Sequence, residues 1–113
     1  FAESDHRNFN ADGQAFNVGE TFAGVPFQDA VDFATKVEAA LAPDCPNATL
    51  AQKSIRWILD HPQVSTVIPG ARSPRQAIDN TVPTYLPELT KESHTLLAEL
   101  YGTKIAPKVR GVY

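Results

Sequence analysis

Apolar residues recur at helical spacing in several stretches of this 113-residue chain. Each such stretch puts its apolar side chains on one stripe, which is typical of a helix packed against a core. A proline follows each of these stretches within two residues and marks the helix end. The helices predicted in this way are 27–42, 48–61 and 90–105, and a further helix, 74–81, is predicted from its start at Ser73-Pro74.

Side chains at the start of three of these helices suit the free amides of a first turn. Thr49 and Gln52 have the spacing of a capping box, in which each side chain bonds the other residue's main chain. Ser73 is a favourable N-cap, and Pro74 follows it where a missing N–H costs nothing. Thr90 is the expected N-cap of the last helix.

The predicted helix 48–61 carries the clearest stripe. Its buried face is expected to contain Ala51, Ile55, Ile58 and Leu59. Trp57 lies off this stripe. Arg56 and Asp60 are spaced to form an ion pair across one helical turn, worth about 0.2–0.5 kcal/mol on a helix surface.

A β-branched run at 64–68 ends in Pro-Gly and predicts a strand, the only one that the pattern indicates. One strand cannot form a sheet, so its neighbours must come from elsewhere. The segment 82–89 contains two prolines and is expected to be an extended connection.

Residues 1–26 show no periodicity but carry four phenylalanines, and we expect a long loop held to a surface by these rings. A structureless opening of this length is uncommon in a compact domain. The chain also contains no methionine. Together these features favour the end of a longer protein over a complete small domain.

Composition excludes several classes of partner. Hydrophobic residues make up 42% of the chain and the net charge is −3, which is typical of a globular protein without general affinity for nucleic acid or anionic membranes. No apolar run is long enough to span a bilayer, and no signal peptide is recognisable. The single Cys45 allows no internal disulfide, which favours a reducing compartment, the cytoplasm.

The turn from 69 to 80 is the best candidate for binding chemistry. Arg72 and Arg75 lie where a helix begins, so guanidinium groups and free main-chain amides meet at one place, which suits a phosphate. Gln76 and Asn80 follow one turn apart, and their amides suit the edge of a heteroaromatic ring. An adenosine with a 2′-phosphate fits both features. Alternatively, Ser73 and Gln76 form a capping box and Gln76 is occupied locally.

The sequence indicates neither a metal site nor a catalytic group. No two of the three histidines, His6, His61 and His94, have the spacing of metal ligands, which favours structural or solvent-exposed roles. No motif for a nucleophile or a phosphate-binding P-loop is present.

Two consecutive stretches resemble a known family. Residues 55–62 (IRWILDHP) followed by 64–74 (VSTVIPGARSP) are similar to the C-terminal part of aldo-keto reductases, and the similarity extends to Gln76 and Asn80. The opening stretches 5–10 (DHRNFN) and 16–22 (FNVGETF) resemble one bacterial-type branch of the family.

The resemblance implies an α/β fold, namely the C-terminal part of a (β/α)8 TIM barrel. This piece would be mostly helical with one barrel strand, because 64–68 would be the eighth strand. Helices 48–61 and 74–81 would flank that strand. Helices 27–42 and 90–105 would be additions outside the barrel repeat, and the whole chain, 1–113, would be this C-terminal portion.

The resemblance also implies a site for NADP(H). Gly70 and Ala71 would line the approach to the adenosine phosphate, and Arg72 with Ser73 would bind the 2′-phosphate. The residues implied at the adenine are Gln76 and Asn80. Many members of the family have Lys-Ser where this chain has Gly-Ala, so the phosphate charge would rest mainly on Arg72.

The catalytic Asp, Tyr, Lys and His of the family lie on earlier barrel strands, and no position here matches them. The chain would therefore be the cofactor-binding part of an oxidoreductase that reduces aldehydes or ketones to alcohols. Its partners would be the remaining N-terminal part of the barrel and a small carbonyl substrate. The alternative is a small helical protein-interaction module without a catalytic role, whose phenylalanines and apolar stripes contact another protein.

Overall fold

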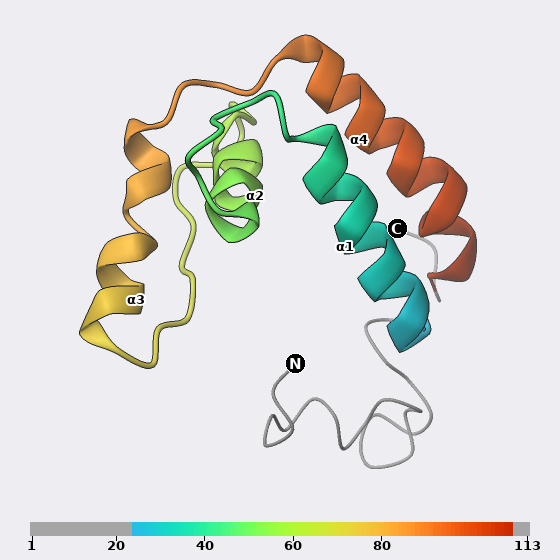
Figure 1. The fold of residues 1–113 in the computed structure, drawn as a ribbon, viewed down its shortest axis with the longest axis horizontal. Helices are drawn as coiled ribbons and strands as arrows, with labels where there is room; N and C mark the ends of the chain where they lie inside the picture. The colour runs from blue at the N-terminus through green and yellow to red at the C-terminus, as the bar shows by residue number, and fades with distance from the viewer. Residues whose placement is uncertain (1–23, 110–113) are drawn as a thin grey trace. The chain divides into compact units, whose positions relative to one another are not determined.

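The computed structural model describes residues 24–109, and every regular element in that range is helical (Figure 1). The predicted loop 1–26 lies outside the described residues except for its last three positions. The elements are α1 (Phe27–Ala40), α2 (Leu50–Leu59), α3 (Pro74–Asp79), the 3₁₀ helix η2 (Val82–Tyr85), α4 (Lys91–Lys104) and the 3₁₀ helix η3 (Ala106–Lys108).

The four α-helices lie within the predicted ranges, and each is two to four residues shorter than predicted. Their starts use the predicted caps. The Thr49 hydroxyl accepts the Gln52 N–H at 3.2 Å, and the Gln52 side chain accepts the Thr49 N–H at 3.0 Å. The Thr90 hydroxyl likewise accepts the Ser93 N–H at 3.2 Å. Local side-chain signals therefore determine where these helices begin.

The predicted strand 64–68 is not a strand in the structure. It runs as an uncoiled segment between α2 and α3, and no strand lies elsewhere in the described range 24–109 (Figure 1). A strand exists only through hydrogen bonds to a neighbouring strand, which this segment lacks. Ile68, at its end, is 92% exposed.

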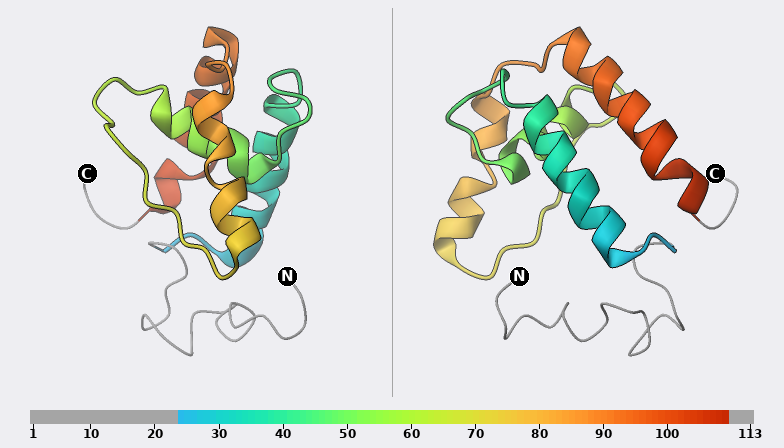
Figure 2. Two further views of the ribbon diagram at one scale, coloured as in Figure 1. Left: turned by 90° about the vertical axis from the view of Figure 1, so that its left-hand side faces the viewer. Right: turned by 45° about the vertical axis from the view of Figure 1, so that its right-hand side comes forward.

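The segment expected to be extended, 82–89, begins instead with η2. Pro83 sits in its first turn, where the fixed φ of proline is compatible with a helix. Two bonds over three residues close this helix, from the Thr84 N–H to the Thr81 carbonyl and from the Leu86 N–H to the Pro83 carbonyl. Figure 2 shows η2 continuing from α3 nearly end to end.

The described residues divide into two compact units, one of residues 38–97 and the other of residues 24–37 with 98–109. In the first unit α2 packs on η2. Leu41 and Pro83 are fully buried there, and Leu89 and Leu97 nearly so. On α2 the predicted stripe is half-buried at Ile55, Ile58 and Leu59, whereas Ala51 is exposed.

A buried lysine joins the end of α1 to α2 within this unit. Lys53 is only 6% exposed, and its Nζ donates to the Leu41 carbonyl at 2.7 Å. This carbonyl lies just past the C-terminal end of α1, where carbonyl groups lack helical partners and a cation is favourable. The charge of Lys53 thus caps α1.

In the other unit, the described residues belong to most of α1, the end of α4, and η3. The Lys108 ammonium forms an ion pair with Asp29 in the first turn of α1. α1 has no buried residue, although Val25 just before it is 4% exposed. In the described range no helix has both the length and the apolar character needed to cross a membrane.

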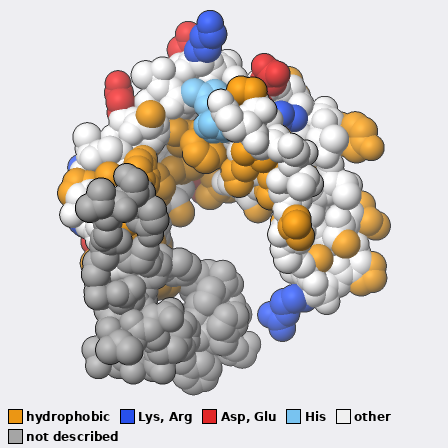
Figure 3. Space-filling view, turned by 180° about the vertical axis from the view of Figure 1, so that it is seen from behind, with side chains coloured by type: hydrophobic (Ala, Val, Ile, Leu, Met, Phe, Trp, Pro, Cys, Tyr) orange, Lys and Arg blue, Asp and Glu red, His pale blue; other side chains and the backbone are white. Residues whose placement is uncertain are grey.

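Large apolar side chains remain uncovered in the 38–97 unit. Ile68, Ile78 and Tyr85 are 92%, 66% and 85% exposed. Hydrophobic side chains are visible at the surface in the space-filling view of Figure 3. Large apolar side chains that remain in water favour contact with a further surface that covers them.

The isolated chain should therefore associate with itself in solution. We expect sedimentation analysis at micromolar concentration to show species larger than the monomer, because the uncovered isoleucines lose water contact on association. The double substitution Ile68→Lys and Ile78→Lys should shift the distribution toward monomer. A monomeric wild-type chain with a cooperative thermal transition would contradict this expectation.

The Asp60 carboxylate should contribute most to stability among the acidic side chains of the 38–97 unit. Its side chain is 5% exposed and accepts three hydrogen bonds, from Arg56, Leu89 and His94. The Asp60→Asn substitution removes the charge and leaves buried donors without partners, so we expect a loss of about 1–3 kcal/mol. The measurement is the free energy of unfolding in urea at fixed protein concentration.

The matched control is Asp79→Asn. The Asp79 side chain is 52% exposed, and its oxygen lies 3.7 Å from Arg75 Nε, so its loss should cost less than about 0.5 kcal/mol. Equal losses in the two variants would show that the buried carboxylate has no special role.

Candidate cofactor-binding site

The turn that leads into α3 is organised by hydrogen bonds from side chains of α3 and its caps. Ser73 is the N-cap, with extended backbone, and its Oγ accepts the Gln76 N–H at 3.2 Å. Pro74 occupies the first turn as predicted. The Gln76 side chain reaches one residue further back than in a capping box, and its Oε1 accepts the Arg72 N–H at 2.7 Å. The carboxamide of Gln76 is thus engaged locally.

Asn80 holds the other side of the same turn. Its Nδ2 donates to the Gly70 carbonyl at 3.1 Å, across ten residues of sequence. Gln76 and Asn80, one helical turn apart, therefore hold the turn at the Arg72 N–H and at the Gly70 carbonyl. Each retains unused capacity among the described residues, the Nε2 donors of Gln76 and the Oδ1 acceptor of Asn80.

The first two residues of the turn are open. Gly70 and Ala71 are exposed, and a Cβ added at Gly70 would meet no atom within 4 Å. The φ of Gly70 is not positive, so other residues could adopt its backbone conformation. The space beside these two residues could therefore hold a ligand or a bulkier side chain.

Two guanidinium groups give the turn a positive charge. Arg72 is exposed, and its side chain forms no hydrogen bond or ion pair with any described residue. Arg75 is 91% exposed and lies 3.7 Å from Asp79, a distance at which exposed pairs are weak. Arg72 is therefore the cation available to an anionic ligand.

α3 is anchored to α2 through a residue of the capping box. Gln52 accepts the Thr49 N–H with Oε1, and its Nε2 donates to the Asp79 carbonyl at 3.2 Å. The Gln52 side chain therefore caps the start of α2 and bonds the last residue of α3. This bond fixes α3, and with it the turn, on the body of the 38–97 unit.

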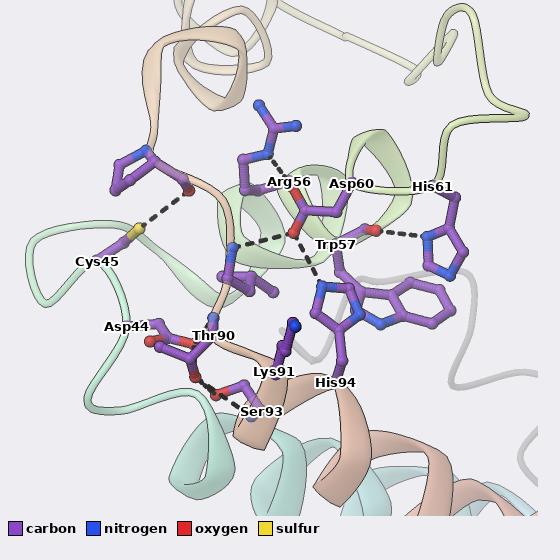
Figure 4. Close-up of polar contacts among 12 residues, drawn as sticks. Asp44, Cys45, Arg56, Trp57, Asp60, His61, Thr90, Lys91, Ser93 and His94 are labelled. Carbon is purple, nitrogen blue, oxygen red and sulfur yellow. Dashed lines mark hydrogen bonds and ion pairs between the residues drawn. The ribbon is translucent and has the colours of Figure 1, made fainter.

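A second polar cluster surrounds Asp60 (Figure 4). Asp60 Oδ1 accepts from Arg56 Nε at 2.7 Å, and Oδ2 contacts the Leu89 N–H at 3.0 Å and His94 Nε2 at 3.1 Å. Arg56 also donates to the Pro83 carbonyl at 3.2 Å. The sequence predicts the Arg56–Asp60 pair but gives no signal for His94, which is 34 residues away.

A carboxylate paired with an imidazole occurs in catalytic triads, which also need a nucleophile at the second imidazole nitrogen. No hydroxyl or thiol of the described residues is bonded to His94. Both Asp60 oxygens are engaged by donors from three segments of the unit. The Asp60 cluster therefore joins α2 to η2, to the main chain at Leu89 and to α4, and we assign it a structural role.

A hollow of about 410 Å³ lies between the 45–48 loop, the start of α2 and residues 82–87. Its walls are mainly apolar and include Val82, Leu86 and Pro87. Cys45 borders it in a left-handed backbone conformation with φ of 47°, and its Sγ lies 3.9 Å from the Pro87 carbonyl. No charged side chain lines this hollow, so it offers no site for a phosphate.

The comparisons with known proteins agree with the resemblance of the turn. The model of the family described as Aldo/keto reductase family matches residues 3–102, most of the chain. No curated protein and no solved structure matches the sequence. A match over this length includes α2, the candidate turn and most of α4, and we conclude that the chain belongs to the aldo/keto reductase family of oxidoreductases.

Proposed function

We propose that this chain is the C-terminal, cofactor-binding part of an NADP(H)-dependent reductase of aldehydes or ketones. The observation that carries the proposal is the Arg72 guanidinium, which is exposed and has no partner among residues 24–109, on a turn held by hydrogen bonds in a chain of the aldo/keto reductase family. The alternative function, a protein-interaction module without catalysis, is not favoured by the family match.

The geometry suggests how the 2′-phosphate would be bound. The Arg72 amide is engaged by Gln76, so the phosphate contacts come from side chains. The Arg72 guanidinium offers paired donors of the geometry that suits phosphate oxygens. The Ser73 oxygen accepts a bond from Gln76 and still has its O–H to donate. Gly70 and Ala71 leave the approach open.

The remaining amide groups suit adenine. The free Nε2 of Gln76 is a donor and the free Oδ1 of Asn80 is an acceptor, which complement a ring nitrogen and the exocyclic amino group. These side chains keep their bonds to the turn while they contact the base. The same two residues would thus position the turn and read the adenine.

The bound NADP(H) would supply the hydride for carbonyl reduction. The catalytic acid and its partners would come from the N-terminal part of the barrel, which we propose as the main partner of this chain. In that assembly the segment 64–68 would pair as the eighth strand and cover its exposed side chains. A small carbonyl compound is the proposed substrate, and the single Cys45 fits the reducing cytoplasm.

The Arg72→Glu substitution tests this proposal in the complete reductase. A charge-assisted contact to phosphate contributes about 1.5–3 kcal/mol, so the Kd for NADPH should rise about 10- to 150-fold. The Kd for NADH, which has no 2′-phosphate, should change much less. Fluorescence titration of both cofactors gives the two constants.

Arg75→Glu is the matched control, because Arg75 is more exposed and already lies beside Asp79. It should weaken NADPH binding less than Arg72→Glu does. Unchanged NADPH affinity in Arg72→Glu, or equal effects on both cofactors, would remove the assigned phosphate site.

A further inference from the structure

Three rings meet where α2 ends and α4 begins, all within the 38–97 unit. The Trp57 and His61 rings have centroids 4.6 Å apart, and the His61 and His94 rings 5.7 Å apart (Figure 4). His61 and His94 are separated by 33 residues, so sequence spacing alone gives no sign of this pairing. The His94 side chain is 31% exposed and His61 is half-buried, which leaves both imidazoles accessible.

Each imidazole has one ring nitrogen held by an acceptor. His61 Nδ1 lies 2.8 Å from the Trp57 carbonyl, and His94 Nε2 lies 3.1 Å from the Asp60 carboxylate. A carbonyl or carboxylate acceptor requires a proton on the facing nitrogen. In the neutral ring the other nitrogen, Nε2 of His61 and Nδ1 of His94, then carries a lone pair. Metal-binding histidines show this arrangement, with one nitrogen on a carbonyl or carboxylate and the other on the ion.

The separation of the rings also suits a shared ion. At a metal–nitrogen distance of about 2.0–2.1 Å, two imidazoles on one tetrahedral ion have centroids about 5–6 Å apart. The observed separation of 5.7 Å falls in this range, with the two ring planes at 64° to each other. The Arg56 guanidinium lies on the opposite side of Asp60 from His94, so it does not stand between the imidazoles (Figure 4).

We propose that His61 and His94 are the two protein ligands of a site for a divalent transition ion, with Zn²⁺ as its representative. Asp60 and the Trp57 carbonyl orient the ligands and do not bind the ion. Within the described range 24–109 no group of three or more His, Cys, Asp or Glu side chains could hold a metal. The proposed site therefore has two protein ligands, and water would fill the remaining positions. Imidazole ligands favour Zn²⁺ or Cu²⁺ over Mg²⁺ or Ca²⁺. This site is independent of the proposed cofactor.

Zinc titration of the full chain by calorimetry, at fixed protein concentration, tests the proposal. We expect one zinc equivalent per chain at this site. Both His61→Gln and His94→Gln should lose it or bind it at least about tenfold more weakly. Glutamine can still donate to the Trp57 carbonyl or the Asp60 carboxylate, so unchanged circular dichroism should accompany the loss.

His6→Gln is the matched control and should keep the zinc equivalent. A second readout is the spectrum of bound Cu²⁺ in electron paramagnetic resonance, which should show two imidazole nitrogens in the wild type and at most one in either variant. Absence of zinc binding to the wild type, or loss in only one of the two variants, would overturn the two-histidine site.

Discussion

The buried carboxylate of Asp60 is the constraint on which the 38–97 unit depends. A charged group with 5% exposure is costly unless its oxygens are satisfied, and here three donors satisfy them. These donors come from α2, from the main chain at Leu89 and from α4. Because all must be present together, the carboxylate fixes the path of the chain from the end of α2 through η2 to the start of α4.

The candidate site is positioned by a different kind of interaction, hydrogen bonds between amide side chains and the main chain. Gln52 ties the end of α3 to α2, while Gln76 and Asn80 shape the turn that carries Arg72. A ligand that meets a prefolded turn loses less affinity to the ordering of that turn. The Gln76 bond occupies the Arg72 N–H, so in the proposed site an anion would be bound by the Arg72 guanidinium and the Ser73 hydroxyl. Gln76 and Asn80 therefore hold the turn in place and leave the Arg72 side chain exposed.

What the sequence predicts correctly here depends on neighbours close in the chain. The capping box of Thr49 and Gln52, the cap at Ser73 and the Arg56–Asp60 pair each involve residues within four positions. Contacts across longer separations leave no comparable trace. The His94–Asp60 bond, the Gln52–Asp79 bond and the approach of His61 to His94 become visible only in three dimensions. The residue pattern at 69–80 and the family resemblance both indicate the proposed cofactor residues, whereas the bonds from Gln76 to Arg72 and from Asn80 to Gly70 are seen only in the structure.

The one missing element, the strand at 64–68, follows from the same distinction. A helix satisfies its main-chain groups within itself, so α2 and α3 form from local signals whatever surrounds them. A strand satisfies these groups only through other strands, and β-branched residues favour the conformation without supplying a partner. In the family's barrel, two neighbouring strands would supply those bonds and cover Ile68. Within the described range 24–109, the segment 64–68 is therefore the one whose structure a surrounding barrel would change most.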